Sequence, residues 1–188
     1  MSSMAKNQTK FVALLRGINV GGKNIIAKAD LIECFEDLGF KNVTTYIQSG
    51  NILFRANTSS VKNVTAKIEK QLSSRFSYDA RAAVMTHRQF VSAVGATHPE
   101  WGKKPDYKHN ALFTLGDTNS KKVLAQLPEP QPGIETVSTA PCVLFWSAST
   151  KNLSRTTIMK LASMQLYKQL TVRNHNTVFK ILDLFDNV

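Results

Sequence analysis

Cysteine is scarce in this sequence. Its 188 residues include two cysteines, Cys34 and Cys142, and these do not form a CxxC pair. Two isolated cysteines supply neither a zinc cage nor a disulfide framework. A chain of this length can bury about 70% of its unfolded surface, so it can fold without cross-links. We therefore predict a protein of a reducing compartment, the cytoplasm, with no metal site and no cofactor.

Long apolar segments, glycine and proline are scarce as well. The longest apolar runs are Phe11–Leu15 and Cys142–Trp146, which are far too short to cross a membrane. The first ten residues lack the apolar core of a signal peptide. With 9 Gly and 6 Pro against 43% hydrophobic residues, the composition excludes fibrous, low-complexity and disordered chains. We expect a folded protein that does not associate with membranes.

Acidic residues are few relative to basic ones. The chain has 24 Lys+Arg and 13 Asp+Glu, which gives a formal charge of +11 without any basic tail. Such an excess suits a polyanionic partner, which could be nucleic acid, a nucleotide or a phosphorylated metabolite. It also suits a surface of solvated lysines and arginines with no partner. Nothing in the composition selects an oligomeric state.

Hydrophobic periodicity predicts a βαββαβ order for a first half that covers residues 11–95. Short apolar strands alternate with helices whose apolar residues recur every three or four positions. Residues 48–51 have the composition of a hairpin turn. This order is the split βαβ arrangement of ferredoxin-like domains. We expect strands at 11–16, 43–47, 52–55 and 78–85, helices around 31–38 and 61–76, and a disordered N-terminus over 1–10.

The second half, residues 96–188, repeats the order more loosely. A short helix ending at Gly95 connects the halves, and a polar loop follows it over 97–109. The sequence therefore predicts an α+β protein with two ferredoxin-like βαββαβ halves, mostly antiparallel sheets and a C-terminal helix. The expected elements are strands at 111–115, 134–138, 142–148 and 170–172, a short helix after Asp117, one from Ser154 through Leu166, and a last one over 178–185.

A first motif, LLRGINVGGKN at Leu14–Asn24, lies between a predicted strand and a predicted helix. Its glycines permit a tight turn that presents backbone N–H groups, and a helix N-terminus favours an anion. The same glycines could instead serve backbone geometry alone, and both interpretations stay open. The candidate ligand-binding residues of this motif are Arg16, Gly17, Asn19, Gly21, Gly22, Lys23 and Asn24.

The spacing of this motif approaches a Walker A loop. Gly17, four residues, Gly22 and Lys23 match GxxxxGK, but Asn24 stands where a serine or threonine would bind magnesium. The predicted βαββαβ order also disagrees with the parallel sheet of a P-loop NTPase. We therefore prefer an anion site without nucleotide hydrolysis.

Two further segments concentrate polar side chains. TTYIQSGN at Thr44–Asn51 contains a hairpin turn, and TVRNHNT at Thr171–Thr177 begins the last helix. Either asparagine of the latter could be an ordinary helix N-cap. The density of hydrogen-bonding groups nevertheless predicts ligand contacts. The candidate residues are Gln48, Ser49 and Asn51 in the hairpin, and Arg173, Asn174, His175, Asn176 and Thr177 at the helix start.

These three motifs, in this order and at these separations, resemble the uncharacterised bacterial family catalogued as domain of unknown function 1697. The resemblance extends from about Phe11 to Phe185 and implies two ferredoxin-like halves, but no established activity. The chain departs from the family at His175, where the family usually has tryptophan. If that tryptophan stacks on a ligand, the ligand here differs, and if it only packs, His175 is a tolerated exchange.

Three functional hypotheses follow. The preferred one is a binding module for a phosphate-bearing small molecule or nucleotide at one site built from the three motifs. Nucleic-acid binding is the alternative, with Phe11 and Phe54 as stacking residues and Trp101–His109 (WGKKPDYKH) as a basic aromatic loop. The second alternative is an enzyme acting on a phosphorylated substrate, for which His175 is the motif histidine, although whether any catalysis occurs stays open.

Overall fold

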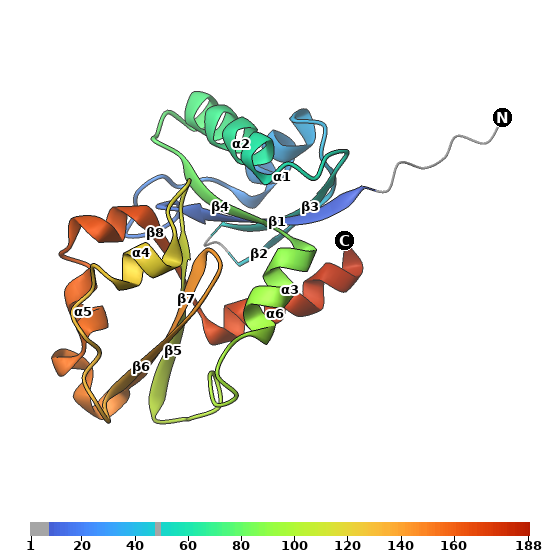
Figure 1. Ribbon diagram of the computed structural model, residues 1–188. Coiled ribbons are helices and arrows are strands. Elements are labelled where there is room, and N and C mark those ends of the chain that lie inside the picture. Colours follow the sequence, from blue (N-terminus) through green and yellow to red (C-terminus); the bar gives the residue numbers. More distant parts are fainter. Residues whose placement is uncertain (1–7, 48–49) are drawn as a thin grey trace. The chain divides into compact units, whose positions relative to one another are not determined.

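The protein is described by a computed structural model that covers residues 8–47 and 50–188 (Figure 1). It divides into two compact units. The first contains the described residues up to Phe90 together with Asp183–Val188, and the second is Val91–Leu182. The sequence analysis placed the division at residue 95 and kept the whole C-terminal helix in the second half. In the structure the chain instead passes between units within two helices, α3 (His87–Gly95) and α6 (His175–Leu184).

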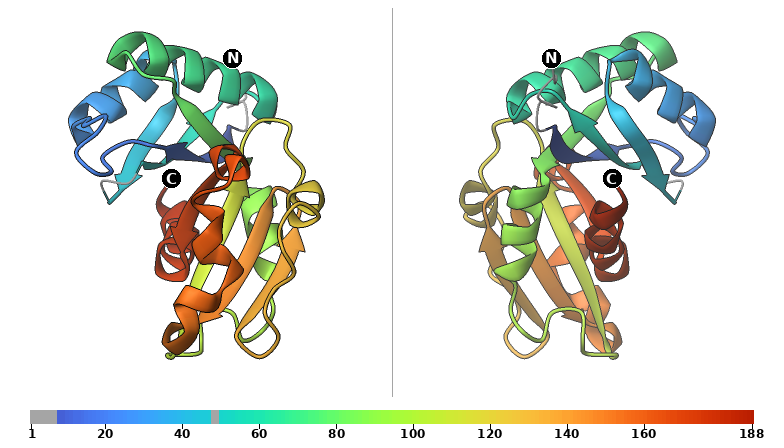
Figure 2. Two further views of the ribbon diagram at one scale, coloured as in Figure 1. Left: turned by 90° about the vertical axis from the view of Figure 1, so that its left-hand side faces the viewer. Right: turned by 90° about the vertical axis from the view of Figure 1, so that its right-hand side faces the viewer.

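The first unit has the predicted ferredoxin-like topology. Its sheet has the order β2-β3-β1-β4, and every neighbouring pair is antiparallel. Two helices, α1 and α2, lie on the same face of this sheet (Figure 2). The elements are β1 (Thr9–Arg16), α1 (Lys28–Asp37), β2 (Lys41–Tyr46), β3 (Asn51–Ala56), α2 (Val61–Phe76) and β4 (Arg81–Thr86).

The core of the first unit follows from alternation along the strands. Every second residue of β1 from Phe11 faces the two helices, because successive side chains of a strand point to opposite faces. Phe11 stacks on Phe54 of β3 with 5.5 Å between ring centroids, and Phe54 packs edge-on against Phe35 of α1. The aromatic cluster therefore locks both central strands to the helical layer.

Both ends of the described chain add to the first unit. The predicted disorder over residues 1–10 falls mostly on residues 1–7, which lie outside the described residues. Thr9 and Lys10 belong to β1, and the Lys10 ammonium donates to the carbonyl oxygen of Phe185 at 2.6 Å. The Phe185 ring packs on His87 with centroids 4.7 Å apart. These contacts attach the last turn, η3 (Phe185–Asn187), to the unit that begins the chain.

The second unit repeats the topology. Its sheet order is β6-β7-β5-β8, again antiparallel throughout, so the prediction of two βαββαβ units is confirmed. Figure 1 shows α4 and α5 on one side of this sheet and α6 on the other. The elements are β5 (Tyr107–Thr114), α4 (Ser120–Leu124), β6 (Glu135–Ala140), β7 (Val143–Ser149), η1 (Thr150–Arg155), α5 (Thr157–Leu161), η2 (Gln165–Gln169) and β8 (Leu170–Asn174).

Two elements of the second unit differ from the sequence prediction. The single helix expected from Ser154 through Leu166 is broken into η1, α5 and η2. The strand expected at 111–115 begins earlier, at Tyr107, inside the segment predicted to be a polar loop. Its first residues pair with the far end of β7, for example His109 with Ser147. The polar side chain of His109 does not prevent this pairing, because its ring nitrogens are hydrogen-bonded to Ser147 Oγ and to the carbonyl oxygen of Lys104.

A buried carboxylate explains where α5 begins. Glu135 is 3% exposed, and its oxygens accept hydrogen bonds from the backbone N–H of Thr157 and from the Trp146 indole N–H, each at 2.9 Å. The N–H of Gln131 donates to it as well. A carboxylate is favoured at a helix N-terminus, and these donors replace the water that it loses on burial. Glu135 thus joins β6, β7 and α5.

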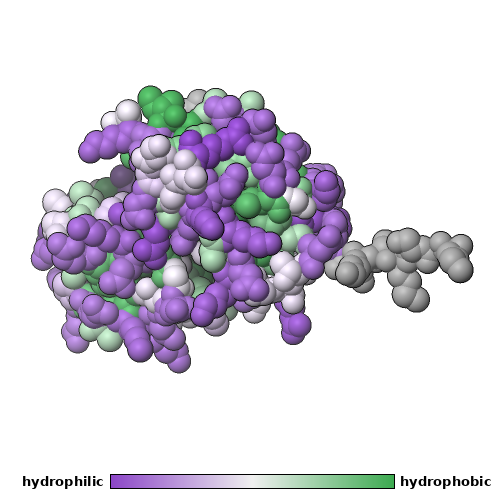
Figure 3. Space-filling model, turned by 90° about the horizontal axis from the view of Figure 1, so that it is seen from above, coloured by the Kyte–Doolittle hydropathy of each residue, from purple (hydrophilic) through white to green (hydrophobic). Residues whose placement is uncertain are grey.

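The surface of the protein is mixed. On the face drawn in Figure 3, hydrophilic residues cover most of the area and hydrophobic ones form separate small patches. Across residues 8–47 and 50–188, none of the helices combines the length and the apolar character needed to cross a lipid bilayer.

The two thiols should differ in reactivity. Cys34 is fully buried on the inner face of α1 and burial raises its pKa to about 11, whereas Cys142 is exposed. Because the thiolate is the reactive form, we expect an aromatic disulfide reagent at pH 8 to modify one thiol of the native protein and two after unfolding in guanidinium. The native reaction should persist in Cys34→Ala and disappear in Cys142→Ser. Two thiols reacting at equal rates in the folded protein would contradict the packing of α1.

Candidate functional site

The first two motifs meet in the first unit. The N–H of Leu15, at the end of β1, donates to the carbonyl oxygen of Gly50 at 2.8 Å. Gly50 has a φ of +72°, and a Cβ placed on it would lie 2.8 Å from atoms of both Leu15 and Ile18. The hairpin turn therefore packs directly against the beginning of the glycine-rich loop. Gln48 and Ser49, which belong to this predicted site, lie outside the described residues.

The glycine-rich loop has an unusual backbone. Five of its residues adopt positive φ angles between 47° and 74°, a region that favours glycine and, among other residues, asparagine. Three are glycines and two are asparagines. These residues are Gly17, Asn19, Gly21, Gly22 and Asn24. The motif therefore encodes a specific loop conformation.

Asparagine side chains hold that conformation. The Asn19 amide accepts from the N–H of Ile26 at 2.8 Å and donates to its carbonyl oxygen at 3.1 Å, across the loop. The Asn24 amide donates to the carbonyl oxygen of Gly17 at 2.7 Å. In the hairpin, the Asn51 amide donates to the carbonyl oxygen of Tyr46 at 2.9 Å. These contacts assign the three amides a role in shaping the loop and the turn.

A cavity of about 300 Å³ lies where the loop runs into α1. Its walls come from the first turn of α1 and from the β2–β3 hairpin, and they include Lys28, Thr45 and Gly50. Ala27 precedes α1 and provides no side-chain cap. The first N–H groups of a helix have no partner within the helix, so they carry partial positive charge. Lys23 is exposed on the loop and Arg16 is half-buried at the end of β1.

The third motif lies in the second unit. Arg173 of β8 is 7% exposed and its guanidinium donates to Thr171 Oγ1 and to the carbonyl oxygen of Val172. Burial lowers the pKa of Arg173 to about 10. Asn174 Oδ1 accepts from the N–H of Thr177 at 2.8 Å, which is the N-cap that the sequence allowed. Asn176 is exposed and Thr177 is buried. The structure thus groups the first two motifs in one unit and this motif in the other.

His175 belongs to an aromatic cluster. Its ring meets the rings of Trp101, His109 and Phe179 edge-on, with centroids 6.3, 5.4 and 6.3 Å away. This environment favours the interpretation in which His175 only packs. A Cβ added at Gly102 would lie 2.8 Å from Phe179 and 3.3 Å from His175, so the loop passes close over α6.

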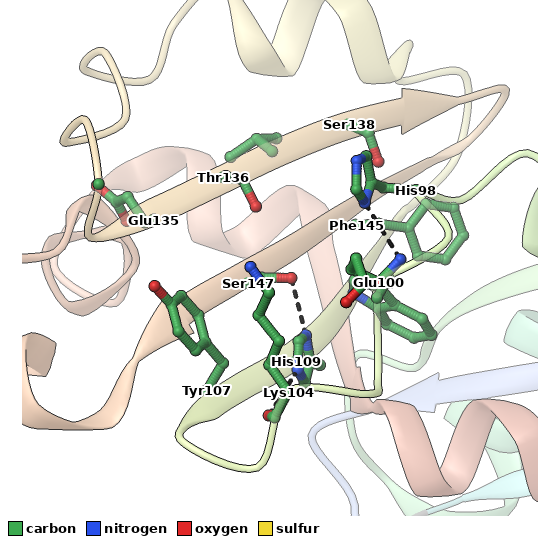
Figure 4. Close-up of a pocket in the computed structure, with 13 residues that line it drawn as sticks. His98, Glu100, Lys104, Tyr107, His109, Glu135, Thr136, Ser138, Phe145 and Ser147 are labelled. Carbon is green, nitrogen blue, oxygen red and sulfur yellow. Dashed lines mark hydrogen bonds between the residues drawn. The ribbon is translucent and has the colours of Figure 1, made fainter.

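A second cavity, of about 260 Å³, opens on the sheet of the second unit (Figure 4). The strand register places Thr136, Ser147 and His109 side by side across β6, β7 and β5. Figure 4 shows these side chains in the cavity, with His98, Lys104 and Tyr107 contributed by the preceding loop and the start of β5. The sequence analysis did not select this site.

His109 is a buried polar group of this cavity with both ring nitrogens hydrogen-bonded. Its Nδ1 lies 2.8 Å from Ser147 Oγ and its Nε2 lies 3.1 Å from the carbonyl oxygen of Lys104. The ring is 3% exposed, and burial is the main cause that lowers its pKa below the ordinary 6.5. The neighbouring charges of His175 and Lys104 act in the same direction, while the bond to the Lys104 carbonyl opposes them. The imidazole is therefore neutral at pH 7.

Sequence reasoning missed this pair for a clear reason. His109 and Ser147 are 38 residues apart and neither belongs to a motif, so only the pairing of β5 with β7 makes them neighbours. The alternation of polar residues along the two strands is the one signal that could have suggested it. Among residues 8–47 and 50–188, no group of three or more His, Cys, Asp or Glu side chains is placed to hold a metal ion.

Comparison with known proteins identifies a family. A family model described as "Protein of unknown function (DUF1697)" matches residues 8–145, which confirms the family, although the motif at Thr171–Thr177 lies beyond the matched residues. The conserved bacterial protein SP0830 from Streptococcus pneumoniae has a similar structure, with a TM-score of 0.84 and 26% identity over 94% of this chain and 98% of that chain. None of the curated proteins compared matches the chain.

A second solved structure matches much less well. It is an unknown protein from Galdieria sulphuraria, with 13% identity over 89% of this chain and 97% of that chain. Its TM-score of 0.29 is too low for any argument about a shared fold.

The packing around Gly50 predicts a large effect of a single methyl group. Gly50→Ala should reduce the free energy of unfolding by about 2–4 kcal/mol, because it adds a clash with Leu15 and Ile18 to the cost of a positive φ. Gly39→Ala is the matched control, since Gly39 has a φ of +82° but open space around its Cβ position. It should cost only about 1–2 kcal/mol. Urea unfolding measures both, and equal losses would show that the contact is not tight.

Burial of His109 predicts a dependence of stability on pH. Since its pKa is lower in the folded than in the unfolded protein, the unfolded state binds more protons below pH 6.5. The contribution of His109 to the free energy of unfolding is complete above pH 6.5, and it is lost as the pH falls towards the pKa of His109 in the folded protein. The free energy of unfolding should therefore decline less between pH 7.5 and 5.5 in His109→Asn than in the original protein. The exposed His98 serves as the comparison, and His109→Asn should change the slope more than His98→Asn does.

Proposed function

Since this chain belongs to the family of proteins of unknown function DUF1697, whose description names no ligand, we propose that it binds a phosphate-bearing small molecule or nucleotide in its first unit. The observation that carries the proposal is the cavity of about 300 Å³ between the start of α1 and the β2–β3 hairpin. The hairpin motif lines this cavity, and the beginning of the glycine-rich motif packs against the same hairpin at Gly50.

The charge around this cavity suits an anion. The N-terminus of α1 has no side-chain cap, so its N–H groups are available for an acceptor such as a phosphate oxygen. Lys28 lines the cavity, and Lys23 is exposed on the adjoining loop. Asp30 also lies in the first turn of α1. Two ammonium groups and the helix dipole outweigh this one carboxylate.

The preformed loop supports affinity. Its left-handed residues and the two asparagine bridges fix the backbone before any ligand arrives. A loop that is already ordered loses less conformational entropy on binding than a flexible one. Asn19 and Asn24 tolerate the left-handed backbone, and their side chains hold the glycine-rich segment in one conformation.

Apolar side chains beside the loop suit the organic part of a ligand. Val20, Ile25 and Ile47 are 63%, 78% and 53% exposed, although large aliphatic residues are usually buried. Ile47 lines the cavity, and Val20 and Ile25 belong to the loop that leads into α1. A nucleoside or another apolar group attached to a phosphate would cover them. This observation favours an organic phosphate over inorganic phosphate.

The alternative of nucleic-acid binding, with bases stacked on exposed aromatic rings, has less support than a small ligand. Phe11 and Phe54 are fully buried under the helices of the first unit. Trp101 of the basic loop is 4% exposed and packs against Phe145, with ring centroids 5.0 Å apart. Stacking of bases needs exposed rings, so we favour a small ligand over nucleic acid. A contribution of Arg173 and its motif to the same ligand remains a prediction.

Calorimetric titration with ATP, adenosine and inorganic phosphate tests the proposal. We expect ATP to bind more tightly than phosphate, and adenosine to bind weakly because it lacks the anion. Lys28→Ala and Lys23→Ala should each weaken ATP binding by about fivefold, a typical loss for one partly exposed charge pair. The exposed Lys67 on α2 provides the control, and Lys67→Ala should leave the affinity unchanged.

Two results would overturn the proposal that the first unit binds a phosphate-bearing ligand. One is the absence of binding of ATP and phosphate at millimolar concentration in low salt. The other is an equal loss of affinity in the Lys28, Lys23 and Lys67 variants, because that would indicate a diffuse electrostatic effect of the net charge.

A further inference from the structure

The cavity on the sheet of the second unit contains a serine, a histidine and a carbonyl group in a connected line. We propose that Ser147 is a nucleophile with His109 as its general base, and that this cavity accepts small carboxylic esters for acyl transfer to water. The site is independent of the proposed phosphate site, because it is built entirely from residues of the second unit.

The hydrogen bonds determine which nitrogen of His109 carries the proton. The carbonyl oxygen of Lys104 can only accept, so Nε2, 3.1 Å away, must be the protonated nitrogen of the neutral ring. Nδ1 is then an acceptor, and the Ser147 hydroxyl, 2.8 Å away, donates to it. This is the arrangement in which an imidazole can remove the hydroxyl proton. The Lys104 carbonyl holds the ring in the required tautomer.

Rigid elements position both groups. Ser147 and His109 are directly paired residues of β7 and β5, so the sheet fixes the distance between their backbones. The His109 ring is also held between Tyr107, stacked at 6.3 Å, and His175, edge-on at 5.4 Å. A nucleophile and base on adjacent strands are held more precisely than the same groups on loops.

Apolar side chains form part of the cavity wall. Trp101 lines the cavity and is 4% exposed. Phe145 supplies an apolar wall for a short acyl chain.

Hydrolysis of the ester requires no reagent other than water. Ser147 Oγ forms a bond to the carbonyl carbon while its proton moves to His109 Nδ1. The C–O bond to the alcohol then breaks, and the departing alkoxide takes that proton. In the second stage His109 removes a proton from water, and the resulting hydroxide oxygen bonds to the acyl carbon. The Ser147 oxygen leaves, regains the proton from His109 and releases the carboxylic acid.

Ser138 provides a matched comparison within the same cavity. It lies on β6, pairs with Phe145 of β7 and also lines the cavity, as Figure 4 shows. Ser147 faces the histidine, whereas Ser138 occupies the next row of the sheet. The two serines line the same cavity, although Ser147 is buried and Ser138 is partly exposed, and they differ in their relation to a base.

Covalent labelling tests the proposal. The full-length protein is incubated with diisopropyl fluorophosphate, which phosphorylates activated serines with loss of HF, and is examined by intact mass and peptide mapping. We expect one adduct, located on Ser147. Ser147→Ala should abolish it, and Ser138→Ala should leave its rate unchanged. His109→Asn keeps a polar partner near Ser147 but no base, and it should slow labelling by on the order of a hundredfold.

Hydrolysis of the ester p-nitrophenyl acetate provides the second measurement. Its rate should decline in Ser147→Ala and in His109→Asn to the same relative extent as the rate of labelling. The peptide map of the unaltered protein decides the matter even if a variant fails to fold. Absence of an adduct, an adduct on another residue, or equal rates in the His109→Asn and unaltered proteins would overturn the proposal.

Discussion

The pairing register of the two antiparallel sheets is the constraint on which the rest of the structure depends. Because side chains alternate between faces, a shift of one residue would exchange the whole buried set for the opposite one. In the second unit this register buries Trp146 beneath the helices and turns its neighbours Phe145 and Ser147 to the other face. The core and the cavity are therefore two outcomes of one set of backbone hydrogen bonds.

The two units use the same topology for different purposes. In the first, the polar groups gather at an end of the sheet, where the loop after β1 and the β2–β3 hairpin border the start of α1. In the second, they lie on the face of the sheet opposite α4 and α5. The first arrangement presents backbone N–H groups and lysines, which suit an anion. The second presents a buried neutral imidazole beside a hydroxyl, which suits proton transfer.

Sequence periodicity was sufficient for the order and type of most elements, because both central strands and the long α2 have strong apolar patterns. It failed at the helix expected from Ser154 through Leu166, where the structure has three short helices, η1, α5 and η2. It also placed the start of β5 too late, because Tyr107–His109 has no apolar pattern and is a strand through its pairing with β7. The motif asparagines stay predicted ligand groups, and Asn19 and Asn24 also form hydrogen bonds within their own loop, which the sequence did not reveal.

The sequence by itself determined the βαββαβ order, the family and the glycine-rich loop, because these depend on local patterns of apolar, glycine and charged residues. Only the tertiary structure decided which distant residues are neighbours. It brought Gly50 against Leu15 and Ile18, placed His109 opposite Ser147, and enclosed His175 among aromatic rings. The physical reason is that strand pairing joins residues that are far apart in the chain, and no local pattern encodes which pairs will face one cavity.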